Sequence, residues 1–207
     1  MKKNNQQPQT NPTITKNGKL FIISAPSGAG KTTICKAILK EFAMLLYSVS
    51  YTTRAPRQGE QHGLDYFFVS QSDFIKGIEQ GQWAEWAQVH GNYYGTSAQF
   101  IDAKLSDGYN VLLDIDVQGA LQILKKYPTS VSIFIMPPSF DVLQTRLYQR
   151  GTENTSTIEK RLLKAKEEMA QKDKYHHIVI NDQLDRAIAD VRSIIHKHSS
   201  EFILQQF

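Results

Sequence analysis

One stretch near the N-terminus constrains the fold of this chain more than any other feature. The short apolar run Leu20–Ser24 leads into the segment Ala25–Thr32, which reads APSGAGKT. From Thr32 onward, apolar residues recur at the spacing of one helix face, at Ile34, Ile38, Phe42 and Leu45. A strand, a glycine-bearing loop and a helix in this order predict an α/β fold with a loop that binds phosphate.

The loop fits the pattern G-x-x-x-x-G-K-[ST] at every fixed position except the first, where Ala25 replaces glycine. In this pattern backbone N–H groups turn toward phosphate oxygens, the lysine reaches the β- and γ-phosphates, and the hydroxyl binds Mg²⁺. Alanine costs little at the first position if its φ angle is negative. We therefore predict that ATP binds here, at Ala25, Pro26, Ser27, Gly28, Ala29, Gly30, Lys31, Thr32 and Thr33.

A second apolar run, Val111–Asp114 (VLLD), ends in a carboxylate. A strand that ends in aspartate supports the metal ion in enzymes with this kind of loop. Taken alone, Asp114 also fits a turn or capping residue at a strand end. Together with the loop, it predicts a Mg²⁺ site formed by Thr32 and Asp114.

The rest of the chain alternates between strand-like and helix-like segments, and its 207 residues are typical of one domain. We predict strands over Val111–Ile115, Val131–Met136 and His177–Ile180, and helices over Ser97–Ser106, Phe140–Gln149, Thr157–Ala170 and Gln183–Glu201. This alternation predicts the α/β class, with a parallel sheet wrapped by helices.

Two regions interrupt the alternation. Residues 51–96 are rich in Tyr, Trp, Gly and Arg and predict a small mixed α/β subdomain, inserted into a core made of 18–50, 97–138 and 171–207. Residues 139–170 are helical, carry arginines and contain a polar interruption, which is typical of a mobile lid. Residues 1–17 are polar and predict a flexible tail.

Composition narrows the classes of function. The net charge is +4, and no cluster of Lys and Arg indicates an arm that binds nucleic acid. No apolar stretch approaches the roughly 20 residues that span a membrane. Cys35 is the only cysteine, which favours a reducing compartment. We expect a cytoplasmic protein without nucleic-acid or membrane partners, either a monomer or a homo-oligomer.

The segment after Ser48 suggests what receives the phosphate. Arg54 and Arg57 bracket an Ala-Pro turn, so that both guanidinium groups are able to face one phosphate. Glu85 lies between Trp83 and Trp86, which predicts a desolvated carboxylate in need of donors. Guanine offers two donors side by side, N1–H and the N2 amino group, whereas adenine has an acceptor at N1. An exposed glutamate on a strand remains the alternative for Glu85, and solvated surface arginines the alternative for the pair.

Five motifs together resemble the bacterial type of guanylate kinase. They are SAPSGAGK, TTRAPRQGE, HGNYYGTS, LDIDVQGA and an R-x-x-x-R-G-T segment, and the resemblance extends from about Lys19 to the C-terminal helix. It implies a P-loop NTPase fold with a GMP-binding subdomain and a lid. It also implies transfer of the γ-phosphate of ATP, with Mg²⁺, to GMP and dGMP.

The resemblance also implies roles for individual residues. GMP-binding residues would be Ser50, Arg54, Arg57, Tyr66, Glu85, Tyr94, Thr96 and Asp116. Catalytic residues would be Lys31, Arg54, Arg146, Arg150 and Arg161, the last three in the lid. Asn181 and Asp182 would lie near the adenine of ATP.

Three alternative functions remain at this stage. The first is a related kinase for another nucleotide or for a sugar phosphate, against which Glu85 argues. The second is an inactive scaffold module that binds phosphopeptides, although such modules typically lose the phosphate-loop residues that are intact here. The third is a nucleotide-binding regulator, which would not need a second site for an acceptor.

Overall fold

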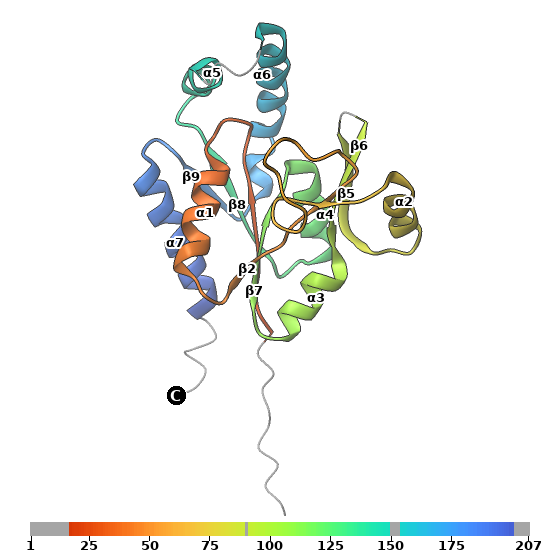
Figure 1. The fold of residues 1–207 in the computed structure, drawn as a ribbon. Coiled ribbons are helices and arrows are strands. Elements are labelled where there is room, and N and C mark those ends of the chain that lie inside the picture. The colour runs from red at the N-terminus through yellow and green to blue at the C-terminus, as the bar shows by residue number, and fades with distance from the viewer. Residues whose placement is uncertain (1–16, 90, 150–153, 201–207) are drawn as a thin grey trace, which may run out of the picture.

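The computed structural model describes residues 17–89, 91–149 and 154–200 (Figure 1). Its main sheet has five parallel strands in the order β2-β7-β1-β8-β9. Their bounds are β1 Leu20–Ser24, β2 Leu45–Tyr47, β7 Asn110–Asp114, β8 Val131–Met136 and β9 His177–Ile180. Strand β1 is central, and all of its residues are buried because helices cover both faces of the sheet.

Successive side chains of β1 point to opposite faces and divide the core in two. Phe21 and Ile23 pack with α1 (Lys31–Glu41) and α7 (Leu184–Ser200) on one face. Leu20 and Ile22 pack with α3 (Ala98–Ser106) and α4 (Val117–Lys126) on the other. The predicted α/β class with a parallel sheet between helices is confirmed.

A second sheet of four strands, in the order β4-β3-β6-β5, stands beside the main sheet (Figure 1). It consists of β3 Tyr51–Thr52, β4 Phe67–Phe68, β5 Trp83–Val89 and β6 Asn92–Ser97, with α2 Gln71–Glu79 between β4 and β5. Gln122 of α4 bonds both the N–H and the carbonyl of Trp86 in β5, at 3.2 and 2.9 Å. This side chain therefore ties the edge of the second sheet to the core.

Helices α5 (Phe140–Gln149) and α6 (Thr155–Met169) pack on each other above the carboxyl ends of β1 and β8 (Figure 1). They have a small apolar cluster of their own, made of Leu143, Leu147, Ile158, Leu162 and Ala165. A 3₁₀ turn, η1 Lys172–Lys174, then leads to β9. None of the helices within the described residues is long and apolar enough to span a membrane.

Some expectations from the sequence need correction. Leu45 does not continue the first helix, because α1 ends at Glu41 and Leu45 begins β2, where it is buried against the sheet. Helices α2 and α4 and strands β2, β3 and β6 were not predicted. The predicted tail, residues 1–17, lies outside the described residues except at its last position.

Candidate active site

Two cavities, each of about 340 Å³, open at the carboxyl ends of β1 and β7. The loop cavity is lined by the phosphate-loop residues, and the glutamate cavity is lined by Glu85 and its neighbours in the second sheet. Lys31, Thr32 and Asp116 line both cavities. Two ligands bound in these cavities would therefore meet at the side chains of Lys31 and Thr32.

The loop cavity contains the predicted phosphate loop at the N-terminus of α1. Gly28 and Gly30 have φ angles of 97° and 94°, which glycine adopts readily and other residues do not. Gly30 is the N-terminal cap of α1, so the free N–H groups of the first helical turn face the cavity. Ala25 is buried in the core beneath the loop, where its small side chain packs with the apolar cluster of β1 and α1.

Lys31 lies where the two cavities join. Its ammonium is 2.5 Å from Oδ1 of Asp114 and 3.1 Å from the carbonyl oxygen of Ile115. The carboxylate of Asp114 and the hydroxyl of Thr32 line the same glutamate cavity. Among the described residues, no three His, Cys, Asp or Glu side chains gather as a metal cage. Oxygen donors of this kind fit Mg²⁺, which usually keeps waters and binds one or two carboxylates together with substrate phosphates.

Helices α5 and α6 reach over the loop cavity. Arg161 of α6 donates hydrogen bonds to the hydroxyl of Ser27, from Nε at 3.1 Å and from a terminal nitrogen at closer range. Arg146 of α5 donates to the carbonyl oxygen of Asn181 at 2.9 Å. A side chain added at Gly28 would touch Leu143 and Leu147 of α5. Arg150, the third predicted lid arginine, lies outside the described residues.

Asn181 and Asp182 directly follow β9, which ends at Ile180. Asn181 is buried, and its amide donates a 2.7 Å hydrogen bond to the carbonyl oxygen of Ala29, so it supports the phosphate loop directly. Asp182 accepts a hydrogen bond from the N–H of Gln183 at 2.7 Å. Their contact with adenine stays a prediction.

Glu85 is the central polar residue of the glutamate cavity. Its side chain is only 6% exposed, and Oε1 accepts a 2.5 Å hydrogen bond from the hydroxyl of Thr96, its register partner across β5 and β6. A Cβ added at Gly119 would lie 2.6 Å from Oε2, so glycine in the first turn of α4 leaves room for the carboxylate.

The reason predicted for the burial of Glu85 is wrong. Trp83 stacks on Phe74 at 4.5 Å, and Trp86 is 38% exposed, so the two tryptophans do not enclose the carboxylate. Glu85 lies on the same side of β5 as Ala87 and Val89, which also line the cavity, because side chains two residues apart in a strand share a face. The shift in register between Trp83 and Glu85 interrupts this alternation at Trp83. Strand β6 and helix α4 provide the burial instead.

This environment changes the ionisation of Glu85. Burial raises the pKa of its carboxyl to about 7, the hydrogen bond from Thr96 opposes this shift, and the charge of Asp116 adds to it. Asp116 is the N-cap of α4 and accepts a 2.8 Å hydrogen bond from the N–H of Gly119 through Oδ1. The cavity therefore holds a desolvated carboxylate with one donor in place and a second oxygen free of hydrogen bonds to the described residues.

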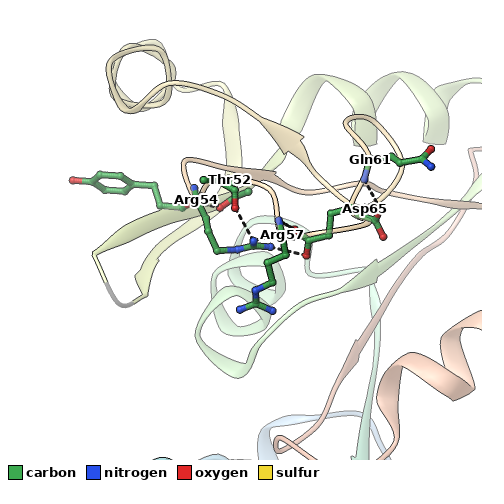
Figure 2. Close-up of polar contacts among 8 residues, drawn as sticks. Thr52, Arg54, Arg57, Gln61 and Asp65 are labelled. Carbon is green, nitrogen blue, oxygen red and sulfur yellow. Dashed lines mark hydrogen bonds and ion pairs between the residues drawn. The ribbon is translucent and has the colours of Figure 1, made fainter. Parts of the chain in front are cut away.

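Neither of the two predicted arginines lines the glutamate cavity, but Arg54 contacts two residues that do, Tyr66 and Tyr94. Figure 2 shows Arg54 and Arg57 on one loop, with hydrogen bonds and ion pairs drawn as dashed lines. The guanidinium of Arg54 lies 5.4 Å from the ring centroid of Tyr66, and it also interacts with the phenol of Tyr94. Tyr66, Tyr94 and Ser50 line the cavity. Of the eight residues predicted for the acceptor, five line the cavity: Ser50, Tyr66, Glu85, Tyr94 and Asp116. Thr96 bonds Glu85 and Arg54 lies against Tyr66, whereas Arg57 is exposed on the loop of Arg54 and does not line the cavity.

Four residues of the site were not predicted. Tyr47 lines the glutamate cavity, and burial raises the pKa of its phenol. Glu168 of α6 lines the loop cavity, and burial raises the pKa of its carboxyl. Gly119 and Glu60 belong to motifs recognised in the sequence. The sequence does not reveal that Gly119 lies against Glu85 or that Glu60 pairs with Arg54, because both contacts form only in the folded chain. The only local signal for Glu168 was its inward position three residues after Ala165.

Comparisons with known proteins agree with this arrangement. The family model described as guanylate kinase matches residues 17–198. Curated proteins named guanylate kinase are 47% identical over 182 residues in Geobacter sulfurreducens and 43% identical over 189 residues in Thermotoga maritima. These matches cover 88% and 91% of this chain, and 90% and 91% of the relatives.

A solved structure is similar over nearly the same range. The crystal structure of guanylate kinase from Anaplasma phagocytophilum superposes with a TM-score of 0.74 at 31% identity. The match covers 89% of this chain and 88% of that one. The chain with this phosphate loop, second sheet and buried glutamate is therefore similar, over nearly its whole length, to proteins named guanylate kinase.

Proposed function

The chain belongs to the guanylate kinase family, and we propose that it transfers the γ-phosphoryl group of ATP to GMP, giving ADP and GDP. dGMP is a second acceptor in this proposal. The observation that carries it is the junction of the two cavities at Lys31 and Thr32. This geometry supports direct transfer between two bound nucleotides, because the donor phosphates and the acceptor phosphate would approach each other there.

The glutamate cavity supports guanine as the acceptor base. In this proposal the ionised carboxylate of Glu85 accepts two hydrogen bonds from guanine, from N1–H and the N2 amino group, while the hydroxyl of Thr96 donates one more to Oε1. Adenine would place its N1 lone pair against the same carboxylate and leave it unpaired at a desolvated site. Ser50 and Asp116 lie beside this position and are proposed to contact the base.

At the other end of the cavity, we assign the phosphate of GMP to the two arginines and two tyrosines: Arg54, Arg57, Tyr66 and Tyr94. Bidentate guanidinium groups match the oxygens of a phosphate dianion. They would hold its attacking oxygen in line with the γ-phosphorus of ATP. In this division of the chain, residues 51–96 bind GMP, residues 139–170 form the lid, and the rest is the core.

On the donor side, the phosphate loop and Lys31 would bind the phosphates of ATP, with Asn181 and Asp182 near the adenine. Mg²⁺, held by Thr32 and Asp114, would neutralise charge on the β- and γ-phosphates. Arg161 already reaches the loop at Ser27, and with Arg146 and Arg150 it would stabilise charge on the transferred group. Helices over the loop cavity would also exclude water and so limit ATP hydrolysis. A cytoplasmic location follows from this proposal, because both nucleotides are cytoplasmic metabolites.

A panel of acceptors tests this function. ADP release is measured with ATP, Mg²⁺ and GMP, dGMP, AMP, CMP or UMP in turn. GMP should be the best acceptor and dGMP the second, with the other three at background. Equal rates with GMP and AMP would refute the role of Glu85, and no release with any acceptor would favour the scaffold alternative.

The raised pKa of Glu85 predicts that GMP binding depends on pH. GMP requires the ionised carboxylate, and the pKa in the free protein is about 7. Affinity should therefore be constant well above pH 7 and fall about tenfold per pH unit below it. Titration calorimetry from pH 5.5 to 8.5 checks this, with Glu85→Gln as the control. The control retains only the titration of the GMP phosphate, whose second pKa is about 6. Identical profiles for the two proteins would contradict the prediction.

A further inference from the structure

Glu60 lies on the same loop as Arg54 and Arg57, and its carboxylate accepts three hydrogen bonds from these two residues. The function proposed above gives Glu60 no role in binding or catalysis. Its carboxylate accepts hydrogen bonds from both terminal nitrogens of Arg54, at 2.9 and 3.0 Å. Oε2 also accepts a 2.7 Å hydrogen bond from the N–H of Arg57, and the N–H of Glu60 donates to the carbonyl oxygen of Arg57 at 3.1 Å. One side chain thus holds the guanidinium of Arg54 and the backbone of Arg57 together.

The hydrogen bonds of Arg54 leave part of its guanidinium available. An arginine has five N–H groups in a fixed plane. Two of them are bound to Glu60, and a third is bound to the carbonyl oxygen of Ala55 at 2.8 Å. The remaining edge consists of Nε–H and one terminal N–H. Tyr94, which lines the glutamate cavity, interacts with this guanidinium.

Glu60 itself does not line the glutamate cavity. Its contacts with Arg54 and Arg57 lower the pKa of its carboxyl, so it stays ionised at neutral pH. A negative charge beside a phosphate site repels the phosphate and weakens its binding, unless the same carboxylate favours binding in another way. Here it fixes the planar fork of Arg54 in one orientation before the ligand arrives, which reduces the entropy lost on binding.

We propose that Glu60 is a positioning residue for the phosphate monoester of the acceptor nucleotide. It orients Arg54 directly and Arg57 through the turn that carries it, without touching the phosphate. This inference rests on the proposed function, since it assigns the acceptor phosphate to Arg54 and Arg57. It extends that function to a residue outside the cavity.

The substitution Glu60→Gln separates positioning from simple charge, because the two effects have opposite signs. Loss of the oriented fork should weaken GMP binding about tenfold or more, whereas loss of a repelling charge alone would tighten it. Guanosine, which has no phosphate, should bind with unchanged affinity. Titration calorimetry at pH 8 measures both ligands, and steady-state kinetics should show a raised KM for GMP with an unchanged KM for ATP.

Two further variants make the test decisive. Glu60→Asp keeps the charge but shortens the side chain, so it should also weaken GMP binding if orientation matters. Glu41→Gln is the matched control, because Glu41 forms an equivalent two-bond ion pair with Arg192 on the surface between α1 and α7. It should leave the affinity for GMP unchanged.

The possible outcomes distinguish this inference from the function on which it rests. Unchanged or tighter GMP binding by Glu60→Gln, or equal weakening of GMP and guanosine, overturns the role of Glu60 alone. If Glu60→Gln does not fold, wild-type affinity in Glu60→Asp overturns it equally. Wild-type protein that binds no GMP overturns the proposed function instead.

Discussion

Glu85→Gln should lower kcat/KM for GMP by about 10²–10³-fold and abolish the preference for GMP over AMP. The glutamine amide offers one acceptor and one donor where the carboxylate offers two acceptors. With guanine, the N–H donor of the amide would face another donor, the N2 amino group. With adenine, the same donor would face the N1 acceptor, and the N6 amino group would face the amide oxygen. The measurement is kcat/KM for both nucleotides at pH 8, above the pKa of about 7 that burial gives Glu85.

A surface substitution of the same kind is the control for Glu85→Gln. Glu79 is exposed near the end of α2, and Glu79→Gln should leave both acceptors unchanged. Thr96 remains available in the variant to donate to the glutamine oxygen. If Glu85→Gln retained wild-type selectivity for GMP over AMP, the base would not be read by this carboxylate.

The second large effect is expected for Lys31→Ala, which should reduce kcat by about 10²–10³-fold while the affinity for GMP changes by less than about threefold. Lys31 is the cation at the junction of the two cavities, where charge develops during transfer. The groups proposed to hold the base and phosphate of GMP remain in place without it. Single-turnover rates and calorimetric titration with GMP measure the two quantities separately.

Removal of Lys31 leaves the carboxylate of Asp114 without its 2.5 Å partner, so thermal denaturation must show that the variant is folded. Lys40→Ala, at the exposed end of the same helix, is the matched control and should have wild-type kinetics. Equal loss of kcat and of GMP affinity would show that the donor and acceptor sites are not separable in the way proposed.

Patterns of residues close together in the sequence predicted the strands and helices whose formation depends mainly on those residues. Strand β1, the glycine loop and α1 were predicted together because the loop fits only between a strand and a helix. Strands β8 and β9 were predicted with correct bounds, since short apolar β-branched runs are typical of a covered parallel sheet. Helix α4 was missed because Gly119 weakens the helical signal, and only the tertiary position of Glu85 explains that glycine.

The same division holds for the site. The chemistry of guanine made Glu85 a candidate, but its burial depends on the register of β5 and β6 and on α4, not on the neighbouring tryptophans. The contact between Glu60 and Arg54 requires the loop to turn back on itself over six residues, which no periodic pattern encodes. Asp116 was expected beside the base, and its role as the cap of α4 became visible only with the helix itself.

The most direct test of the account follows the transferred phosphate itself. Purified protein is mixed with ATP, GMP and Mg²⁺, and the reaction is followed by ³¹P NMR. We predict that the γ-phosphate signal of ATP declines in step with the appearance of the β-phosphate signal of GDP, with inorganic phosphate no higher than in a sample without protein. Release of inorganic phosphate while GMP stays unchanged would contradict transfer between the two cavities.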